Sequence, residues 1–450
     1  GLALAIFAQQ DMADDYFLWY NMGAGATPSA PTSNSTDYRM ESYFSRLNYN
    51  YAHKYLLTLT GRFDGSSRFG ADNKFSFFPS AAFAWRVSEE EFLKDVEQLS
   101  NLKLRMSYGL TGNSEIGSYR SLANMSTTSY VFNGQRITGA AIGRLANPLL
   151  QWEKTAEYNL GFDVGFFNNR LSLSGDYYVK KTHDLLFDAP VPATSGYTTV
   201  TRNIGSIENK GVEFAFNSVN VQNKDFTWMT TFNLATLKNK VLALGANNED
   251  IKYGFKEALI LRVGESAGSI FGYERAGIWG TAQEAEAAKY GKLPGDLRIV
   301  DQNNDGLINN EDRVIIGKGI PDFYGTLLNS FQYKAFDLIL ELQFSQGNDI
   351  FNNHRNSAEA RQGIANSFST VLDAWTPDNQ DAVLEQVRPT GAYYHYYMDT
   401  RKLENGSFLR GKNLSLGYTF SPAVNKKLGI SNLRIYSSFQ NFFILTEYSG

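Results

Sequence analysis

The stretch LQWEKTAEYNLGFDVGFFNNRLSLSGDYYVKKT, residues Leu150–Thr182, carries the pattern that decides the fold. On both sides of a turn at Asn168–Asn169, apolar and aromatic side chains recur at every second position. These positions are Tyr158, Leu160, Phe162, Val164 and Phe166 before the turn, and Leu171, Leu173, Tyr177 and Val179 after it. Because successive side chains of a strand point to opposite faces, the stretch predicts two long strands with one apolar face.

The length of these strands indicates a membrane protein. Each has about a dozen residues, whereas about five or six are usual in globular proteins. In a transmembrane β-strand, about nine to eleven tilted residues cross the bilayer, with apolar side chains toward lipid and polar ones toward the lumen. Small, polar and charged residues such as Asn159 and Asp163 fill the second face here. The pattern therefore predicts an all-β fold, a transmembrane antiparallel β-barrel in the outer membrane.

The composition narrows the class further. The chain of 450 residues has 14% aromatic residues and a mean hydropathy of -0.33. No run reaches the roughly 18 apolar residues of a transmembrane helix, whereas barrel strands are only half apolar. The absence of cysteine excludes thiol catalysis and cysteine-based metal sites, and the net charge of -4 gives no reason to expect a nucleic-acid partner.

Alternating segments along the chain predict further strands. They are Gly1–Ala8, Tyr38–Asn50, Lys54–Asp64, Lys74–Val87, Leu102–Leu110, Ile207–Val219, Phe226–Leu237, Phe323–Tyr333, Phe336–Phe344, Phe408–Phe420 and Leu433–Phe443. With the hairpin, they make about thirteen strands. Pro79 removes one ladder donor and predicts a bulge or bend within its strand. Ser88–Ser100 is the one predicted helix, because Ser88 and Glu91 form a capping box before an apolar face.

The predicted connections alternate strictly between short and long. The long ones include Gln9–Asp37, the segment from Leu110 to Leu149, and the excursions Lys238–Ile320 and Ser345–Asn405. Outer-membrane barrels have short periplasmic turns and long extracellular loops, so the alternation favours that class. An odd number of strands and the open edges that it leaves predict that residues 1–450 form one partial barrel, lacking strands at both ends.

Seven segments, in order, closely resemble SusC/RagA-type TonB-dependent outer-membrane transporters. They are RLNYNYAHKYLLTLTGRFDGSSRFG (Arg46–Gly70), FFPSAAFAWRVSEEEFL (Phe77–Leu93), LKLRMSYGLTGNSEIG (Leu102–Gly117), NPLLQWEKT (Asn147–Thr155), NIGSIENKGVEF (Asn203–Phe214), GDLRIVDQNNDGLINNEDRVIIGKGIPDFYGTLLNSFQYKAFDL (Gly295–Leu338) and NGSFLRGKNLSLGY (Asn405–Tyr418). Together they span nearly the whole chain.

This resemblance implies a 22-stranded barrel with a plugged lumen, of which about thirteen strands are present here. The N-terminal plug, the TonB box, the first strands and the last strands would lie outside this segment. The family is a receptor and not an enzyme, and it imports oligosaccharides or peptides with TonB energy coupling. The implied partners are a SusD-like surface lipoprotein that acts as a lid, the TonB complex through the missing N-terminal region, and outer-membrane lipid.

The segment Asp301–Asp312, DQNNDGLINNED, is the sharpest chemical motif. It matches the EF-hand-like pattern D-x-N-x-D-G-x-I-x-x-x-D, in which oxygen ligands alternate along the loop and a glycine permits the sharp turn. The predicted ligands of a structural calcium ion are Asp301, Asn303, Asp305 and Asp312 by side chain and Leu307 by its carbonyl, with Asn309 acting through water. Asp312 stands where an EF-hand has Glu, and a solvated turn without an ion is the alternative.

Aromatic residues of the long loops are candidates for ligand contact. They are Tyr393, Tyr394, Tyr396 and Tyr397 in the run AYYHYYM, together with Trp279 and Trp375. Aromatic faces stack on sugar rings or peptide side chains, and a loop core or a contact with the lid is the alternative. The carboxylates of the polar strand face are expected to bond to arginines, the plug or water. They are Asp163, Asp176, Glu213, Asp337 and Glu341.

Two other classes stay open from the sequence. A secreted, soluble all-β protein that binds or cleaves glycans with calcium fits the loops, but it does not need long lipid-type strands; extraction without detergent would reveal it. A passive porin fits the strands, but it would lack the motifs that couple to a plug.

Overall fold

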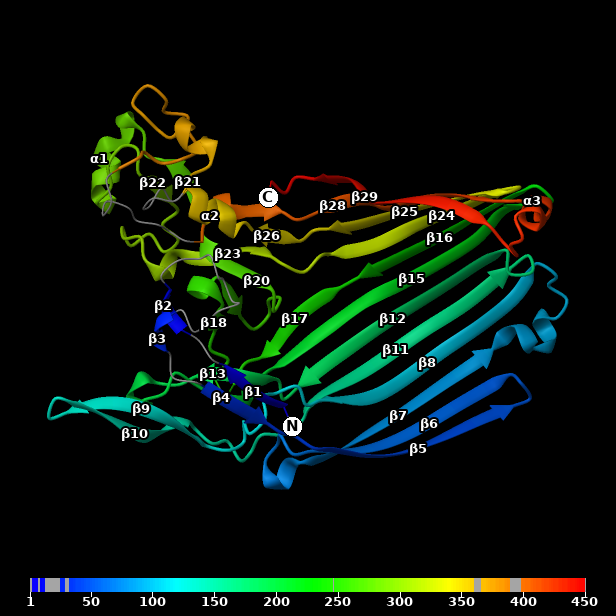
Figure 1. Cartoon of the computed structure of the whole chain (residues 1–450), viewed down its shortest axis with the longest axis horizontal. Helices are drawn as coiled ribbons and strands as arrows, with labels where there is room; N and C mark the ends of the chain where they lie inside the picture. The colour runs from blue at the N-terminus through cyan, green and yellow to red at the C-terminus, as the bar shows by residue number, and fades with distance from the viewer. Residues whose placement is uncertain are drawn as a thin grey trace.

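The fold is dominated by one antiparallel sheet of long, tilted strands (Figure 1). The computed structural model describes residues 2–6, 9–12, 25–28, 32–245, 247–359, 366–388 and 398–449. The sheet consists of β5 (Met40–Tyr51), β6 (Tyr55–Ser66), β7 (Phe75–Arg86), β8 (Leu99–Asn113), β11 (Glu153–Phe166), β12 (Leu171–His183), β15 (Ser206–Gln222), β16 (Phe226–Thr236), β17 (Lys238–Ala243), β24 (Phe323–Tyr333), β25 (Phe336–Gln346), β28 (Phe408–Thr419) and β29 (Arg434–Thr446). None of the described helices is long and apolar enough to cross a membrane.

Each long strand pairs with its neighbours in the sequence, as in an up-and-down barrel wall. The continuous path is β29-β28-β25-β24-β16-β15-β12-β11-β8-β7-β6-β5, and β17 pairs with β15 beyond the end of β16. In the described part of the chain, β5 and β29 each have one partner strand. The predicted number of about thirteen strands is confirmed, although β17 belongs to the sheet in place of the predicted strand Gly1–Ala8.

The two faces of the sheet differ as the alternation predicts. In the β11–β12 hairpin, Leu160 lies opposite Tyr177, whereas Asp163 lies opposite Ser174 on the other face. Tyr158, Leu160 and Tyr177 are 55%, 59% and 47% exposed. Such large exposed hydrophobic side chains form the surface that a barrel turns toward lipid. The face with Asp163 is therefore the inner face of the wall, and we use inner and outer in this sense.

Short and long connections lie at opposite ends of the strands (Figure 1). The turn between β5 and β6 places Ala52 and His53 at φ 53° and 58°, and that between β11 and β12 places Asn168 and Asn169 at φ 57° and 59°. At the other end, segments 114–152, 184–205, 237–322 and 347–407 connect the strands. The predicted placement of long loops at one end and short turns at the other is confirmed, but the alternation is not strict, because segment 67–74 at the long-loop end is shorter than segment 87–98 at the short-turn end.

Small sheets and short helices occupy the long connections. The two-stranded sheets are β1 (Leu2–Ile6) with β4 (Thr32–Thr36), β2 (Gln9–Met12) with β3 (Gly25–Pro28), β9 (Asn124–Phe132) with β10 (Gln135–Arg144), β13 (Leu186–Pro190) with β14 (Thr199–Asn203), β21 (Arg275–Ile278) with β22 (Leu297–Ile299), and β26 (Asp349–Phe351) with β27 (Leu403–Asn405). A four-stranded sheet has the order β18 (Ile251–Tyr253), β19 (Leu259–Leu261), β20 (Ser269–Tyr273), β23 (Arg313–Lys318). The α-helices are α1 (Glu284–Ala287), α2 (Asn353–Glu359) and α3 (Pro422–Lys427), of which α3 joins β28 to β29 at the short-turn end.

Short 3-10 turns complete the described part of the chain. They are η3 (Ala71–Asn73), η4 (Val87–Glu89), η5 (Glu91–Leu93), η6 (Ala193–Ser195), η7 (Phe255–Glu257), η8 (Thr281–Gln283), η9 (Ala288–Tyr290), η10 (Asn310–Asp312), η11 (Ser369–Asp373) and η12 (Thr400–Lys402). The prediction of a helix over Ser88–Ser100 is wrong, because this segment holds only η4 and η5 before β8 begins. Between them, Glu90 has extended backbone angles, φ -78° and ψ 147°.

Two further expectations need correction. Pro79 makes no bulge: it pairs directly with Gly61 of β6, and the ladder from β7 to β8 begins one residue later, at Ser80. Proline, which lacks an N–H, thus lies where the β8 ladder ends. The predicted loops Gln9–Asp37 and 110–149 also contain strands, namely β2, β3 and β4 in the first and the β9–β10 hairpin in the second.

Candidate functional site

The predicted site residues lie in the two longest connections, which meet beyond the long-loop end of the sheet (Figure 1). We call residues 237–322 and 347–407 the loop crown. Its interior includes an apolar cluster of Ala258, Ile270 and Met398, so the two connections share a core. The backbone N–H of Tyr273 donates to the Met398 carbonyl oxygen at 2.7 Å, which fastens one connection to the other.

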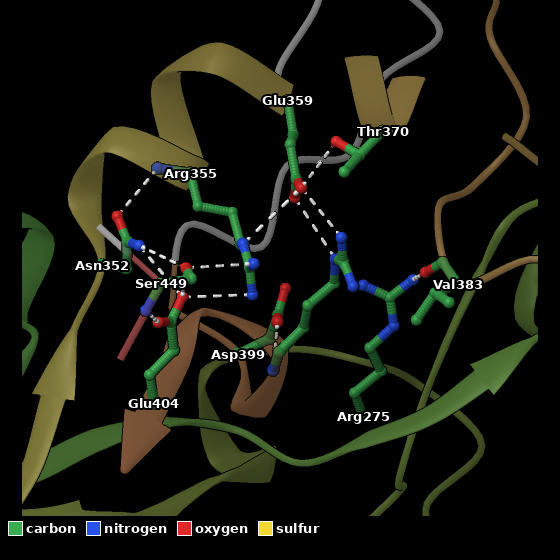
Figure 2. Close-up of polar contacts among 10 residues, drawn as sticks. Arg275, Asn352, Arg355, Glu359, Thr370, Val383, Asp399, Glu404 and Ser449 are labelled. Carbon is green, nitrogen blue, oxygen red and sulfur yellow. Dashed lines mark hydrogen bonds and ion pairs between the residues drawn. The ribbon is translucent and has the colours of Figure 1, made fainter. Parts of the chain in front are cut away.

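Ion pairs and hydrogen bonds join distant residues within the second connection (Figure 2). The guanidinium of Arg401 forks onto Glu359 of α2, with Nη2 to Oε1 at 2.8 Å and Nε to Oε2 at 3.2 Å. Arg355 of the same helix contacts the Glu404 carboxylate at 3.1 Å. Glu359 and Glu404 are 5% and 9% exposed, so both charges are buried and paired, as burial requires.

The same network reaches the segment after β29 and the first connection. The backbone N–H of Ser449 donates to Glu404 at 2.7 Å, and Asn352 donates to it at 2.9 Å. Burial raises the pKa of Glu404, but these hydrogen bonds and the charge of Arg355 outweigh it, so the pKa is lowered overall. Arg275, in the first connection, donates to the Val383 carbonyl, and burial lowers the pKa of its guanidinium. These contacts thus hold the two connections of the crown together.

The predicted calcium loop is present as a closed turn between β22 and β23. Gly306 has φ 81°, and its N–H donates to Asp301 Oδ2 at 2.9 Å. Asp305 Oδ1 accepts from the Leu307 N–H at 2.7 Å. Asp312 is fully buried, and its two oxygens accept from the backbone N–H groups of Gln302 and Asn309 at 2.9 and 2.8 Å.

These hydrogen bonds stabilise the folded conformation of the loop, but they do not by themselves arrange oxygen ligands around an ion. Within the residues that the structure describes, no three His, Cys, Asp or Glu side chains gather as metal ligands. Asn303 donates to Asp305 Oδ2 at 3.0 Å, so two predicted ligands bond to each other. A strand, β23, follows the loop where an EF-hand has a helix. Calcium binding stays a prediction.

The two predicted tryptophans lie inside the crown. Trp279 is 4% exposed, its ring stacks on Tyr290 with centroids 5.9 Å apart, and Arg298 lies 4.8 Å from its centroid. Trp375 is 2% exposed, and its Nε1 has no hydrogen-bond partner in the described part of the chain. Neither ring offers a free face to a ligand in this structure, and their contact with substrate stays a prediction.

The tyrosine run lies outside the described residues. This applies to Tyr393, Tyr394, Tyr396 and Tyr397. Its two flanks are fixed on the crown: Arg388 contacts Asp296 at 2.9 Å, and Met398 is 2% exposed. Contact of the tyrosine run with a ligand stays a prediction.

The inner face of the wall carries charges that are mostly paired. Asp163 and Asp176 share the guanidinium of Arg105, with four contacts of 2.9 to 3.0 Å, and Lys103 contacts Asp163 at 2.7 Å. Asp337 pairs with Arg434, and Glu341 pairs with Lys412. The expectation that these carboxylates bond to arginines is confirmed for Asp163, Asp176 and Asp337, whereas Glu341 bonds to a lysine.

Glu213 is the remaining inner-face carboxylate that the sequence singled out. It lies opposite Asp176 and makes no ion pair within the described residues. Together with Asn233, Thr326 and Gln343, it lines a groove of about 430 Å³ on the inner wall.

The architecture of the chain indicates its structural class. Long tilted strands with an apolar outer face and a charged inner face, with short turns at one end and long loops at the other, are the features of an outer-membrane β-barrel. The family model described as "TonB dependent receptor-like, beta-barrel" matches residues 6–441. The chain belongs to this family of outer-membrane proteins, which excludes the soluble secreted alternative.

Individual relatives agree with the SusC/RagA resemblance. "TonB-dependent receptor P3" of Formosa agariphila is 40% identical over 439 residues, which are 96% of this chain and 43% of that protein. "TonB-dependent receptor SusC" of Bacteroides thetaiotaomicron is 34% identical over 437 residues, 93% of this chain and 42% of that protein. The solved structure described as "Structure of the RagAB peptide transporter" has a TM-score of 0.81 at 29% identity and covers 97% of this chain and 47% of that chain. The chain thus spans less than half the length of these relatives.

Proposed function

We propose that this chain is the wall and loop crown of an active importer that takes up oligosaccharides, with TonB energy coupling and a SusD-like lid lipoprotein. The observation that carries the proposal is the similarity over 97% of the chain to the RagAB transporter at a TM-score of 0.81. The polar contacts that hold the crown together support the proposal, because a lid needs a rigid surface on which to close. The paired charges of the inner wall suit contact with a polar plug.

The oligosaccharide assignment rests on the tyrosine run. Tyrosine rings present a broad apolar face with a polar edge, which matches a sugar ring. The described residues on either side of the run, Arg388 and Met398, are held on the crown at the long-loop end, which supports this assignment. A peptide is the second candidate ligand, favoured by the similarity to RagAB, which is described as a peptide transporter.

Uptake by whole cells tests the proposal. A strain without the gene is complemented with the full-length protein, and import of labelled oligosaccharides and labelled peptides is measured with and without an active TonB complex. We expect uptake of one oligosaccharide class that stops when either the gene or TonB is removed. Uptake of peptides alone would shift the ligand to the second candidate, and uptake that is indifferent to TonB would contradict active import.

The tyrosine run is tested by its own variant. We expect a protein with Tyr393, Tyr394, Tyr396 and Tyr397 replaced by Ala to bind the imported ligand about tenfold more weakly, or worse, as several ring contacts are lost. Tyr130→Ala in the exposed β9–β10 hairpin is the matched control, since this ring is 71% exposed and lies outside the crown. Equal affinity of both variants would remove the tyrosine run from the ligand site.

A further inference from the structure

At the long-loop end of the wall, β17 takes the place of β16 beside β15 (Figure 1). A groove rich in lysine lies at this pair of strands. Its volume is about 390 Å³. Three segments form it, namely the paired strands, the turn at 264–266 and the approach to β24. The charged residues that line it are Glu208, Lys210, Lys238, Lys240, Lys318 and Asp322.

The pairing within this groove places positive charges against each other. Lys210 of β15 lies directly opposite Lys238 of β17 in the antiparallel ladder, so both side chains leave the same face. Like charges directly opposite each other destabilise a strand pair. Two lysines side by side therefore form an arrangement that an anion between them would stabilise.

The nearby carboxylates do not neutralise the groove. Glu208 contacts Lys181 and Lys210, each at 3.5 Å, and Asp322 pairs with Lys318. The ammonium groups of Lys238 and Lys240 make no ion pair anywhere in the described residues, although Lys240 lies opposite Glu208 in the ladder. Two cations thus remain available for a ligand.

The lysine side chains of the groove lie on the outer face of the wall, next to its exposed apolar side chains. Val212 of β15 lies opposite Tyr177 of β12, and these side chains are 42% and 47% exposed. Two residues further along β15, on the same face, the side chain is Lys210. The outer surface thus changes from apolar to cationic at the level where a bilayer ends and its headgroups begin.

The inner face at this level carries amide side chains in place of lysines. Asn209 and Asn239 lie between the lysines in sequence and point to the opposite face, where the Asn239 amide donates to the Asn209 carbonyl oxygen at 2.6 Å. A solute that passes through the lumen would meet these amides rather than the lysines. Lys210, Lys238 and Lys240 thus leave the outer face, whereas Asn239, which also lines the groove, leaves the inner face.

We propose that this groove binds the phosphate group of an outer-leaflet lipid headgroup. Lysine ammonium groups recognise phosphate as point charges, and cations near a membrane surface attract anionic lipid. The acyl chains of such a lipid would lie along the apolar outer face beside Tyr177 and Val212. The site depends on the outer-membrane placement of the wall and not on the identity of the imported ligand.

Lipid binding to the full-length protein in detergent tests the proposal. The probes are a phosphorylated lipid A, the same lipid without phosphate, and inorganic phosphate as a competitor. We expect the parent protein to bind the phosphorylated lipid and the Lys238→Ala, Lys240→Ala double variant to bind it about thirty-fold more weakly. Lys238→Arg with Lys240→Arg keeps the charges and is expected to bind like the parent.

A second double variant controls for charge and folding. Lys426→Ala with Lys427→Ala removes two exposed lysines from α3 at the opposite end of the wall and is expected to bind the lipid normally. Unchanged binding by the Lys238, Lys240 alanine variant would overturn the proposal, as would equal binding of the lipid without phosphate. Full displacement by inorganic phosphate at equal concentration would assign the groove to a soluble anion instead. Every readout is binding and not uptake, so failure here leaves the import proposal standing.

Discussion

Arg105 on the inner wall joins three neighbouring strands through one side chain. From β8 it reaches Asp163 on β11 and Asp176 on β12, and each carboxylate receives two of its N–H groups. We expect Arg105→Ala to lower the free energy of unfolding by about 2 kcal/mol, between the costs for exposed and buried pairs, because Asp176 would lose its cationic partner and Asp163 would keep only Lys103. Urea unfolding of the protein in detergent, followed by tryptophan fluorescence, measures this change.

The planar fork of Arg105 is the specific feature under test. Arg105→Lys keeps the charge but cannot bond to both carboxylates in the same way, so we expect an intermediate loss. Arg136→Ala removes a fully exposed arginine of β10 and serves as the control, with no expected change. If the Arg105→Lys variant were as stable as the parent protein, charge alone would account for the contribution of this contact.

Glu90 binds three side chains in the connection between β7 and β8. Lys54 donates to it at 2.9 Å, the Tyr55 hydroxyl at 2.7 Å and the Trp85 indole N–H at 3.0 Å. These donors, with the charge of Lys54, lower the pKa of Glu90 from 4.5 to about 2. A lowered pKa means that the folded state favours the carboxylate, so this contribution is full above pH 4.5 and is lost as the pH falls toward 2.

The pH dependence of thermal unfolding tests this contribution. We expect the Tm of the parent protein to exceed that of Glu90→Gln near pH 7, and the difference to shrink between pH 4.5 and 2. Glu97→Gln, in the same connection and exposed, makes the same charge change without losing these contacts. A difference between parent and Glu90→Gln that stays constant down to pH 2 would contradict the assignment.

The same glutamate explains why the helix predicted over Ser88–Ser100 does not form. Ser88 and Glu91 carry the local signal for a helix start, but Glu90 between them is held in an extended conformation. Its partners Lys54 and Trp85 come from β6, β7 and their flanks, and no local pattern reveals them. Tertiary contacts therefore override the local propensity.

The long strands are predictable because their faces meet different solvents. The predicted strand Phe323–Tyr333 agrees with β24 to the residue, since lipid on one side and the lumen on the other impose a strict period of two. The β9–β10 hairpin escapes the same reasoning, although its Asn133–Gly134 turn, with φ 50° and 75°, is a strong hairpin signal. It pairs only with itself in the described structure, so the strict wall pattern is absent there.

The crown is predictable only in part. The sequence marks Asp301–Asp312 by its regular spacing, but the pairs Glu359–Arg401 and Arg355–Glu404 join residues more than forty positions apart with no motif. The burial of Trp279 and Trp375 is also invisible in the sequence, because aromatic residues serve equally in loop cores and at ligand surfaces. Ion pairs between residues far apart in the sequence can be identified only when the fold is known.

Calcium addition tests the loop between β22 and β23. We expect calcium at about a hundred times its dissociation constant to stabilise the protein by about 2.7 kcal/mol, and a chelator to reverse this. Asp305→Asn should weaken the effect about tenfold or more, because one ligand charge is lost. Asp378→Asn, at an exposed site elsewhere in the crown, is the control. The absence of any calcium-dependent Tm shift at millimolar concentration would leave a solvated turn as the better description.

At the scale of the whole molecule, the chemistry of each surface depends on which face or end of the barrel wall it belongs to. The outer face carries exposed apolar side chains, and the inner face carries charges that are mostly paired. The lysine groove lies at the long-loop end, where Figure 1 shows the crown. The short-turn end has only tight turns, η4, η5 and α3 in the described part of the chain. This division fixes which end of the wall faces outward, since long loops of such barrels are extracellular.

The orientation can be measured because the chain has no cysteine of its own. Asn247→Cys places a thiol at an exposed position of the crown, and Lys427→Cys places one on α3 at the opposite end. With a maleimide that does not cross membranes, we expect intact cells to label only the crown thiol, and permeabilised cells to label both. Labelling of Lys427→Cys alone in intact cells would show that the wall has the opposite orientation in the membrane. The crown and its tyrosine run would then face the periplasm, where neither a surface lid nor a ligand arriving from outside could reach them first.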